Sequence, residues 1–144
     1  MKKIILLLCM CFLLIACDVP TKNSGIVDLG VYEVVDVINS QKQDNFLLYI
    51  TSDKCYSCEE YEKVITKLQK EYGFTIYRLK MNVDEKNNDV KKAFSELEVS
   101  CGRVEVLPMT YYFSQGVVLP ENKKAGYVEE EDMVVWLKNI NLIK

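Results

Sequence analysis

The sequence predicts an α/β fold in which helices flank a central mixed β-sheet. Short apolar runs typical of strands alternate with longer segments whose apolar residues recur at helical spacing. Strands that alternate with helices favour parallel pairs joined by right-handed crossovers, and a hairpin near the end would add an antiparallel pair. With 144 residues, 49% of them hydrophobic, the chain can bury the core of one domain but not of several.

Each predicted element rests on a local pattern of apolar residues and chain breakers. Phe46–Ile50 is a continuous apolar run, as expected for a strand buried on both faces. The segment after it repeats apolar residues at helical spacing up to Gly73, which suits a helix C-cap. Gln115 and Gly116 are a turn signal, after which the chain can return as a hairpin. In order, we expect a helix at 31–39, a strand at 46–50, a helix from the 55–58 region to 72, a strand at 74–82, a helix at 84–98, a strand at 109–114, its hairpin partner at 117–119 and a helix at 129–140.

The first sixteen residues have the anatomy of an export signal. Lys2 and Lys3 precede an unbroken apolar run from Ile4 to Ile15. A helix that spans a bilayer needs about 20 apolar residues, and this run is shorter. The pattern therefore predicts a signal peptide at residues 1–16 rather than a transmembrane helix.

The end of this segment, Leu14-Ile15-Ala16-Cys17, resembles the lipobox of bacterial lipoproteins. The resemblance implies that Cys17 carries a diacylglyceryl thioether, begins the mature chain and anchors it outside the cytoplasm on the bacterial cell membrane. Two acyl chains anchor stably where one binds only marginally. The alternative is an ordinary signal peptide cleaved near a chance cysteine. Residues 17–30 are then expected to be a membrane tether and residues 31–144 the folded domain.

Composition excludes several classes of function. The chain has 18 basic and 21 acidic residues, a net charge of −3 and no basic block, so we expect no nucleic-acid partner. It has no histidine, which excludes Ser-His-Asp and Cys-His catalysis and metal ligation by imidazole. It has no glycine-rich dinucleotide fingerprint, so no cofactor is expected beyond a redox-active cysteine pair.

The candidate reactive motif is Cys55-Tyr56-Ser57-Cys58, which lies at the junction of a predicted strand and a predicted helix. The unpaired N–H groups and the dipole of a helix N-terminus favour an anion, so Cys55 is expected to form a thiolate readily and to attack a disulfide. Cys58 would then resolve the mixed disulfide. Lys54 adds a positive charge that favours the thiolate, whereas Glu59 and Glu60 oppose it.

Two other roles are open for this pair. A zinc site needs four ligands, and with Cys101 as a third the sequence offers no fourth from histidine or a second C-x-x-C, so we expect no metal. A static disulfide is possible in an exported protein, but so short a loop contributes little chain-entropy stabilisation. A C-x-x-C beside a βαβ pattern favours redox chemistry.

From about Val31 to the C-terminus, the chain resembles the thioredoxin family. The matching features are the strand 46–50 leading to the cysteine pair, Asn82-Val83-Asp84 after the next strand, Leu107-Pro108 followed by Phe113 and Gly116, and Gly126 before the last helix. The resemblance implies a thioredoxin-like fold with Pro108 in cis beside the cysteines and the backbone of Leu107 facing an extended substrate. The alternative is a trans proline that opens an edge strand.

The chain departs from the family pattern at several points. Lys54 replaces the usual tryptophan, Tyr56-Ser57 replaces Gly-Pro, and Tyr49 replaces the acid beneath the active site. That acid assists proton transfer from the second cysteine, so its absence argues against a fast general reductase. The stretch 84–108 is longer than in a minimal thioredoxin, which suggests a longer helix or an added loop around Cys101. Size, export and the unusual C-x-x-C look closer to bacteriocin transport accessory proteins.

Cys101 is the odd cysteine of the mature chain if Cys17 carries lipid. It lies seven residues before Pro108, where we expect an added loop. It can be a small buried hydrophobic residue or a third redox participant that traps an intermediate.

Two functions from different classes follow. The first is a membrane-anchored, extracytoplasmic thiol–disulfide oxidoreductase that acts on cysteines of exported proteins or peptides and exchanges electrons with a membrane redox partner. The second is a non-catalytic thioredoxin-fold lipoprotein that serves as accessory component of a secretion system of bacteriocin type and binds a peptide beside Pro108. Tyr111 and Tyr112 could line such a groove, or they could be core residues. We expect the oxidoreductase.

Overall fold

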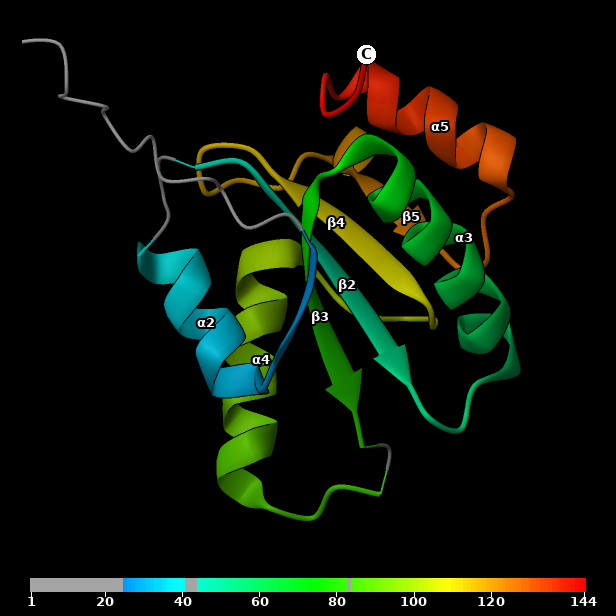
Figure 1. The fold of residues 1–144 in the computed structure, drawn as a ribbon. Coiled ribbons are helices and arrows are strands. Elements are labelled where there is room, and N and C mark those ends of the chain that lie inside the picture. Colours follow the sequence, from blue (N-terminus) through cyan, green and yellow to red (C-terminus); the bar gives the residue numbers. More distant parts are fainter. Residues whose placement is uncertain (1–24, 41–43, 83) are drawn as a thin grey trace, which may run out of the picture.

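The computed structural model describes residues 25–40, 44–82 and 84–144. A five-stranded sheet in the order β1-β3-β2-β4-β5 lies between two helical layers (Figure 1). Helices α2 and α4 cover one face, and α3 and α5 cover the other. The elements are β1 (Gly25–Leu29), α2 (Val31–Ser40), β2 (Phe46–Ser52), α3 (Tyr56–Tyr72), β3 (Thr75–Met81), α4 (Asn88–Cys101), β4 (Met109–Phe113), the short 3-10 helix η2 (Pro120–Asn122), β5 (Lys123–Ala125) and α5 (Glu130–Asn139).

The sheet is mixed, as predicted. Strands β1 and β2 both pair with β3 in parallel. Strand β4 runs antiparallel to β2, and β5 runs antiparallel to β4. The predicted class, a central mixed sheet flanked by helices, is confirmed.

Strand β2 is the centre of the fold and carries the chain to the cysteine pair. All seven of its residues are buried, which explains its unbroken apolar run. Because successive side chains alternate between faces, Leu48 and Ile50 pack toward α2 and α4, whereas Leu47 and Tyr49 pack toward α3 and α5. The C-terminal end of β2 therefore emerges between two filled cores, and this holds the start of α3 in place.

The N-terminal boundary of the folded domain differs from the prediction. Gly25–Leu29, which fell inside the predicted tether, is strand β1 and pairs residue by residue with β3. It is an edge strand with only partial burial, and its five residues include a glycine and Asp28, so they show no strong apolar alternation. The tether prediction is wrong for these residues, because the folded domain includes Gly25–Leu29 as well as the part from Val31 onward. Residues 1–24, with the predicted signal peptide and Cys17, lie outside the described residues.

The hairpin partner of β4 also lies elsewhere. The turn at Gln115 and Gly116 is present, both residues having positive φ, but after it Val117 forms only an isolated bridge with Ser114. The strand that pairs with β4 is β5, six residues beyond Val117. The prediction of a strand at 117–119 is therefore wrong.

The helix before Pro108 is shifted relative to the prediction. It starts at Asn88 because the side chain of Asn87 accepts a hydrogen bond from the backbone N–H of Asp89 at 2.8 Å, an N-cap. It continues to Cys101, with Gly102 as its C-cap. Of the two expectations for this stretch, the longer helix is therefore correct and the added loop around Cys101 is wrong. Within the described ranges, no helix is both long and apolar enough to cross a membrane.

Candidate functional site

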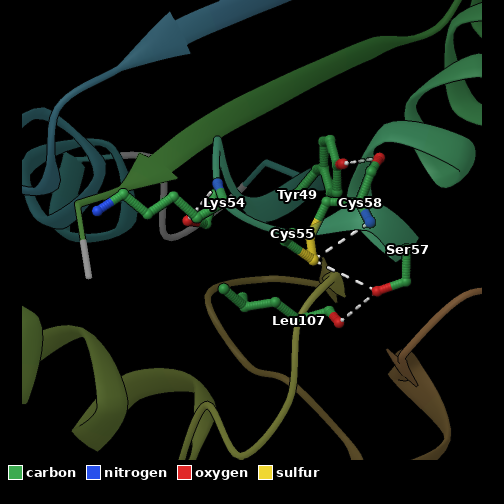
Figure 2. The surroundings of a disulfide bond; sticks show 7 residues. Tyr49, Lys54, Cys55, Ser57, Cys58 and Leu107 are labelled. Carbon is green, nitrogen blue, oxygen red and sulfur yellow. Dashed lines mark hydrogen bonds between the residues drawn. A yellow bond between two sulfur atoms is a disulfide. The ribbon is translucent and has the colours of Figure 1, made fainter.

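The cysteine pair lies at the junction of β2 and α3, as predicted. Cys55 is the N-cap of α3, and its Sγ accepts a hydrogen bond from the backbone N–H of Cys58 at 3.2 Å (Figure 2). The two cysteines form a disulfide with 5.2 Å between their Cα atoms. Cys55 is partly exposed, whereas Cys58 is 1% exposed. An incoming sulfur can therefore reach Cys55 but not Cys58.

The segment before β4 brings a second group to the pair. The Leu107–Pro108 peptide bond is cis, as the resemblance implied. The Ser57 hydroxyl donates a hydrogen bond to the carbonyl oxygen of Leu107 at 3.2 Å and lies 3.3 Å from the Sγ of Cys55 (Figure 2). On the other side, the backbone N–H of Gly126 donates to the carbonyl of Pro108 at 2.8 Å. Leu107 and Pro108 are thus fixed beside the disulfide by bonds to α3 and to the end of β5.

Lys54 does not lie as predicted. Its ammonium group forms an ion pair with Asp84 and points away from the disulfide (Figure 2). Both side chains are 67% exposed, so this contact contributes little to stability. The positive charge of Lys54 is matched by Asp84, and the helix N-terminus rather than Lys54 remains as the feature that favours a thiolate at Cys55.

Tyr49 occupies the space beneath the disulfide where the resemblance expects an acid. It is fully buried in β2, and its hydroxyl donates to the backbone carbonyl of Cys58 at 3.3 Å. Burial raises its pKa above the ordinary value, so it stays neutral at physiological pH. Tyr49 can hold the first turn of α3 in place, but it does not supply a carboxylate to Cys58.

A charged cluster that the sequence reading missed lies behind Cys58. The guanidinium of Arg78 in β3 contacts Glu62 in α3 and binds Asp28 in β1 at 2.7 Å. The hydrogen bond from Arg78 lowers the pKa of Asp28, and the same bond raises the pKa of Arg78. A cavity of about 200 Å³ is lined by Cys58, Glu62 and Arg78 among others. The spacing of four residues between Cys58 and Glu62, which puts both on one helix face, was the available signal.

A larger cavity of about 560 Å³ lies between α2, β3 and α4, and neither cysteine of the pair lines it. Among the described residues, no group of three or more histidine, cysteine, aspartate or glutamate side chains is placed to hold a metal ion.

Cys101 is buried at the end of α4 with 2% exposure. Its Sγ donates to the backbone carbonyl of Leu97 at 3.2 Å. Burial raises the pKa of this thiol to about 11, so it is protonated at neutral pH. Such a thiol is a poor nucleophile, and these properties fit a small buried core residue.

The tyrosines after Pro108 do not line a groove. Tyr111 is fully buried and Tyr112 is 8% exposed, and they belong to the cores on opposite faces of the sheet. Two exposed apolar side chains are sequence neighbours of the site: Tyr56, directly after Cys55, and Val106, directly before Leu107.

The fold, the cysteine pair at the helix N-terminus and the adjacent cis-proline define a thioredoxin-fold protein with a C-x-x-C disulfide. The family model of TraF, described as F plasmid transfer operon protein, matches residues 17–116. The chain belongs to this family. The narrower assignment to bacteriocin transport accessory proteins stays a prediction. No curated protein matches the chain at a significant level.

Solved structures show the same fold at low sequence identity. Thioredoxin f2 of Chlamydomonas reinhardtii matches with a TM-score of 0.62 and 13% identity over 83% of this chain and 100% of its own. Oxidised thioredoxin O2 of Arabidopsis thaliana matches at 0.57 and 21% identity, over 81% of this chain and 95% of its own. Thioredoxin of Aeropyrum pernix matches with a TM-score of 0.59 and 17% identity, over 78% of this chain and 84% of its own.

Proposed function

We propose that the protein is an extracytoplasmic thiol–disulfide oxidoreductase, anchored in the membrane through lipid on Cys17, that acts on cysteines of exported proteins or peptides. The observation that carries the proposal is the asymmetry of the pair. Cys55 is reachable at the N-terminus of α3, Cys58 is buried behind it, and the cis Leu107–Pro108 bond lies beside them. This arrangement separates an attacking sulfur from a resolving one.

The reaction conserves atoms and electrons without a further cofactor. In the reducing direction, the Cys55 thiolate attacks a substrate disulfide, forms a mixed disulfide and expels one substrate thiolate. Cys58 loses its proton to water and attacks the Sγ of Cys55, which forms the protein disulfide and releases the second substrate thiolate. Two electrons pass from the protein to the substrate, and a membrane redox partner must return them. The oxidising direction is the reverse.

The surface around the disulfide fits an extended peptide. The Leu107 backbone lies next to the pair, and the residues that follow Cys55 and precede Leu107 in the sequence, Tyr56 and Val106, are 78% and 45% exposed. An apolar residue beside the substrate cysteine can pack on these side chains while the peptide backbone bonds to Leu107. The family description, F plasmid transfer operon protein, supports exported components of a transfer or secretion apparatus as the substrates.

A second candidate is a non-catalytic binding protein of such an apparatus. Tyr49 favours it, because the buried position beneath the disulfide holds a neutral phenol and no carboxylate. In that case the disulfide only stabilises the start of α3.

Trapping of mixed disulfides separates the two candidates. The full chain carrying Cys58→Ser cannot resolve a mixed disulfide at Cys55. It should therefore accumulate covalent adducts through Cys55 with a disulfide-containing peptide such as insulin. Cys55→Ser should form none, and Cys101→Ser, as the matched control, should behave like the unaltered protein. If Cys58→Ser forms no more adduct than Cys55→Ser, the oxidoreductase proposal is wrong.

A further inference from the structure

We propose that the Ser57 hydroxyl is a two-position switch that couples the state of Cys55 to the Leu107 carbonyl. It donates to Leu107 while Cys55 is in the disulfide, and to the Cys55 sulfur when that sulfur is a thiolate. The carbonyl is then fully released for a substrate only when the nucleophile is formed. The inference rests on the proposed oxidoreductase function and adds a residue and a regulation to that site.

The geometry allows one donor bond at a time. The Oγ of Ser57 lies 3.2 Å from the Leu107 oxygen and 3.3 Å from the Cys55 sulfur (Figure 2). A backbone carbonyl only accepts hydrogen bonds, and a serine hydroxyl has a single proton. In the disulfide state the proton of Ser57 therefore points to Leu107. The sulfur next to it is a weak acceptor and does not compete.

Reduction and deprotonation reverse this preference. A thiolate is charged, and hydrogen bonds to an ionised acceptor are roughly twice as strong as those between neutral groups. The backbone N–H of Cys58 already donates to the same sulfur at 3.2 Å, and the Ser57 hydroxyl is the second donor within reach. The Cys55 proton leaves to water, and Ser57 keeps its own proton and only rotates. No covalent bond of Ser57 is made or broken.

The rotation changes what a peptide finds at Leu107. A carbonyl that shares its lone pairs with Ser57 is a weaker partner for a substrate N–H than a free one. A peptide disulfide should therefore bind the reduced protein, with its Cys55 thiolate, more tightly than the same peptide binds the oxidised protein. When the protein disulfide forms again, Ser57 returns to Leu107 and competes with the bound product, which favours release.

Other charged groups around the pair do not produce this signal. The chain has no histidine, so no imidazole titrates near neutral pH. Lys54 is paired with Asp84, and Tyr49 stays neutral. Behind Cys58, Glu62 and Arg78 are paired with each other. Further titratable groups lie on α3, on the loop after β2, on β3, on β5 and around Leu107. They include Tyr56, Glu59, Glu60, Asp53, Lys80, Arg103, Glu105, Lys123, Lys124 and Tyr127.

Carbonyl NMR on the reduced full chain in detergent tests the switch directly. Labelling leucine with ¹³C at the carbonyl and proline with ¹⁵N marks the two Leu–Pro bonds of the sequence, Leu107–Pro108 and Leu119–Pro120. The second bond is an internal reference, since Leu119 is the N-cap of η2 and belongs neither to the motif nor to the segment of Leu107. In parallel, the pH dependence of iodoacetamide alkylation at Cys55 is followed by mass spectrometry of the tryptic peptide 55–63.

The proposal predicts that the Leu107 carbonyl resonance shifts with the same pH midpoint as Cys55 alkylation, while that of Leu119 stays constant. Ser57→Ala should raise the Cys55 midpoint by about one pH unit, because the thiolate loses a charge-assisted bond. It should also abolish most of the Leu107 shift. Ser57→Thr keeps the hydroxyl, so its Cys55 midpoint and its Leu107 shift should match those of the unaltered protein.

Two results would overturn the switch. One is a Leu107 resonance that stays constant in the unaltered protein while Cys55 titrates. The other is a Ser57→Ala protein with an unchanged Cys55 midpoint. If Cys58→Ser forms no more mixed disulfide than Cys55→Ser in the trapping experiment, the oxidoreductase function itself is wrong. Trapping that succeeds while the Leu107 resonance stays constant refutes only the switch.

Discussion

Replacing Arg78 by methionine is expected to destabilise the protein by about 2 kcal/mol at pH 7. Arg78 joins three elements, since its guanidinium binds Asp28 of β1 and Glu62 of α3 from its own position in β3. Methionine preserves much of the length and apolar contact of the side chain. The substitution therefore removes the charge and leaves two carboxylates without their cation.

The magnitude follows from the burial of the three side chains. They are 18% exposed at Arg78, 29% at Glu62 and 62% at Asp28. Exposed ion pairs contribute about 0.2–1 kcal/mol, and removing one partner of a buried pair costs about 3–5 kcal/mol. The contact with the exposed Asp28 should contribute an energy near the range of exposed pairs, and the contact with Glu62 an energy between the ranges of exposed and buried pairs. Together they give about 2 kcal/mol.

The pH dependence has a definite sign. The bond from Arg78 holds the pKa of Asp28 below its usual value of 3.8. A carboxyl group with a lowered folded-state pKa stabilises the protein above its unfolded-state pKa, and this contribution is lost as pH falls through the folded-state value. The free-energy difference between the unaltered protein and Arg78→Met should therefore narrow between pH 7 and pH 3.

Urea unfolding followed by the fluorescence of Trp136, the single tryptophan, measures the free energy of unfolding at both pH values. Arg78→Lys keeps the charge but loses the bidentate geometry of the guanidinium. Its free energy of unfolding should therefore lie between those of the unaltered protein and Arg78→Met. Lys63→Ala removes an exposed pair with Glu60 and should change stability by less than about 0.5 kcal/mol. A loss at Arg78→Met as small as that of Lys63→Ala, or one equally large at pH 3, would refute the reasoning.

Three further predictions follow from the site and its support. Tyr49→Phe removes the bond to the Cys58 carbonyl and should cost about 1 kcal/mol of unfolding free energy in urea. Cys101 should resist iodoacetamide at pH 8 in the native protein and react in urea, because its pKa is raised to about 11; rapid native alkylation would contradict its burial. Gly73→Ala should lower stability by about 1 kcal/mol, because Gly73 caps α3 at φ 69°; an unchanged urea midpoint would contradict this.

The elements with strong periodic patterns were predictable from the sequence. Strand β2 follows from its unbroken apolar run, and α3 follows from its apolar stripe and from Gly73. Strands β1 and β5 could not be predicted from the sequence. Each is a short edge strand whose position is set by pairing with β3 or β4 rather than by its own composition. Edge strands bury little, so their sequences carry little pattern.

At the candidate site, the local motif was predictable and its contacts were not. The spacing of Cys55 and Cys58 at a strand-to-helix junction was visible in the sequence, and the cis bond at Pro108 came from the family resemblance. The pairing of Lys54 with Asp84 depends on where β3 ends, which sequence order does not reveal. The approach of Ser57 to Leu107 joins residues 50 positions apart and needs the assembled fold.

The reduction potential of the Cys55–Cys58 pair tests the central claim most directly. The full chain, with Cys101 changed to serine, is equilibrated in glutathione and dithiothreitol buffers, and the oxidised fraction of the tryptic peptide 55–63 is measured by mass spectrometry. The proposed function predicts a reversible pair within the range of known oxidoreductases, about −270 to −120 mV. A pair that remains oxidised in buffers poised well below about −300 mV would behave as a structural disulfide and would contradict the account.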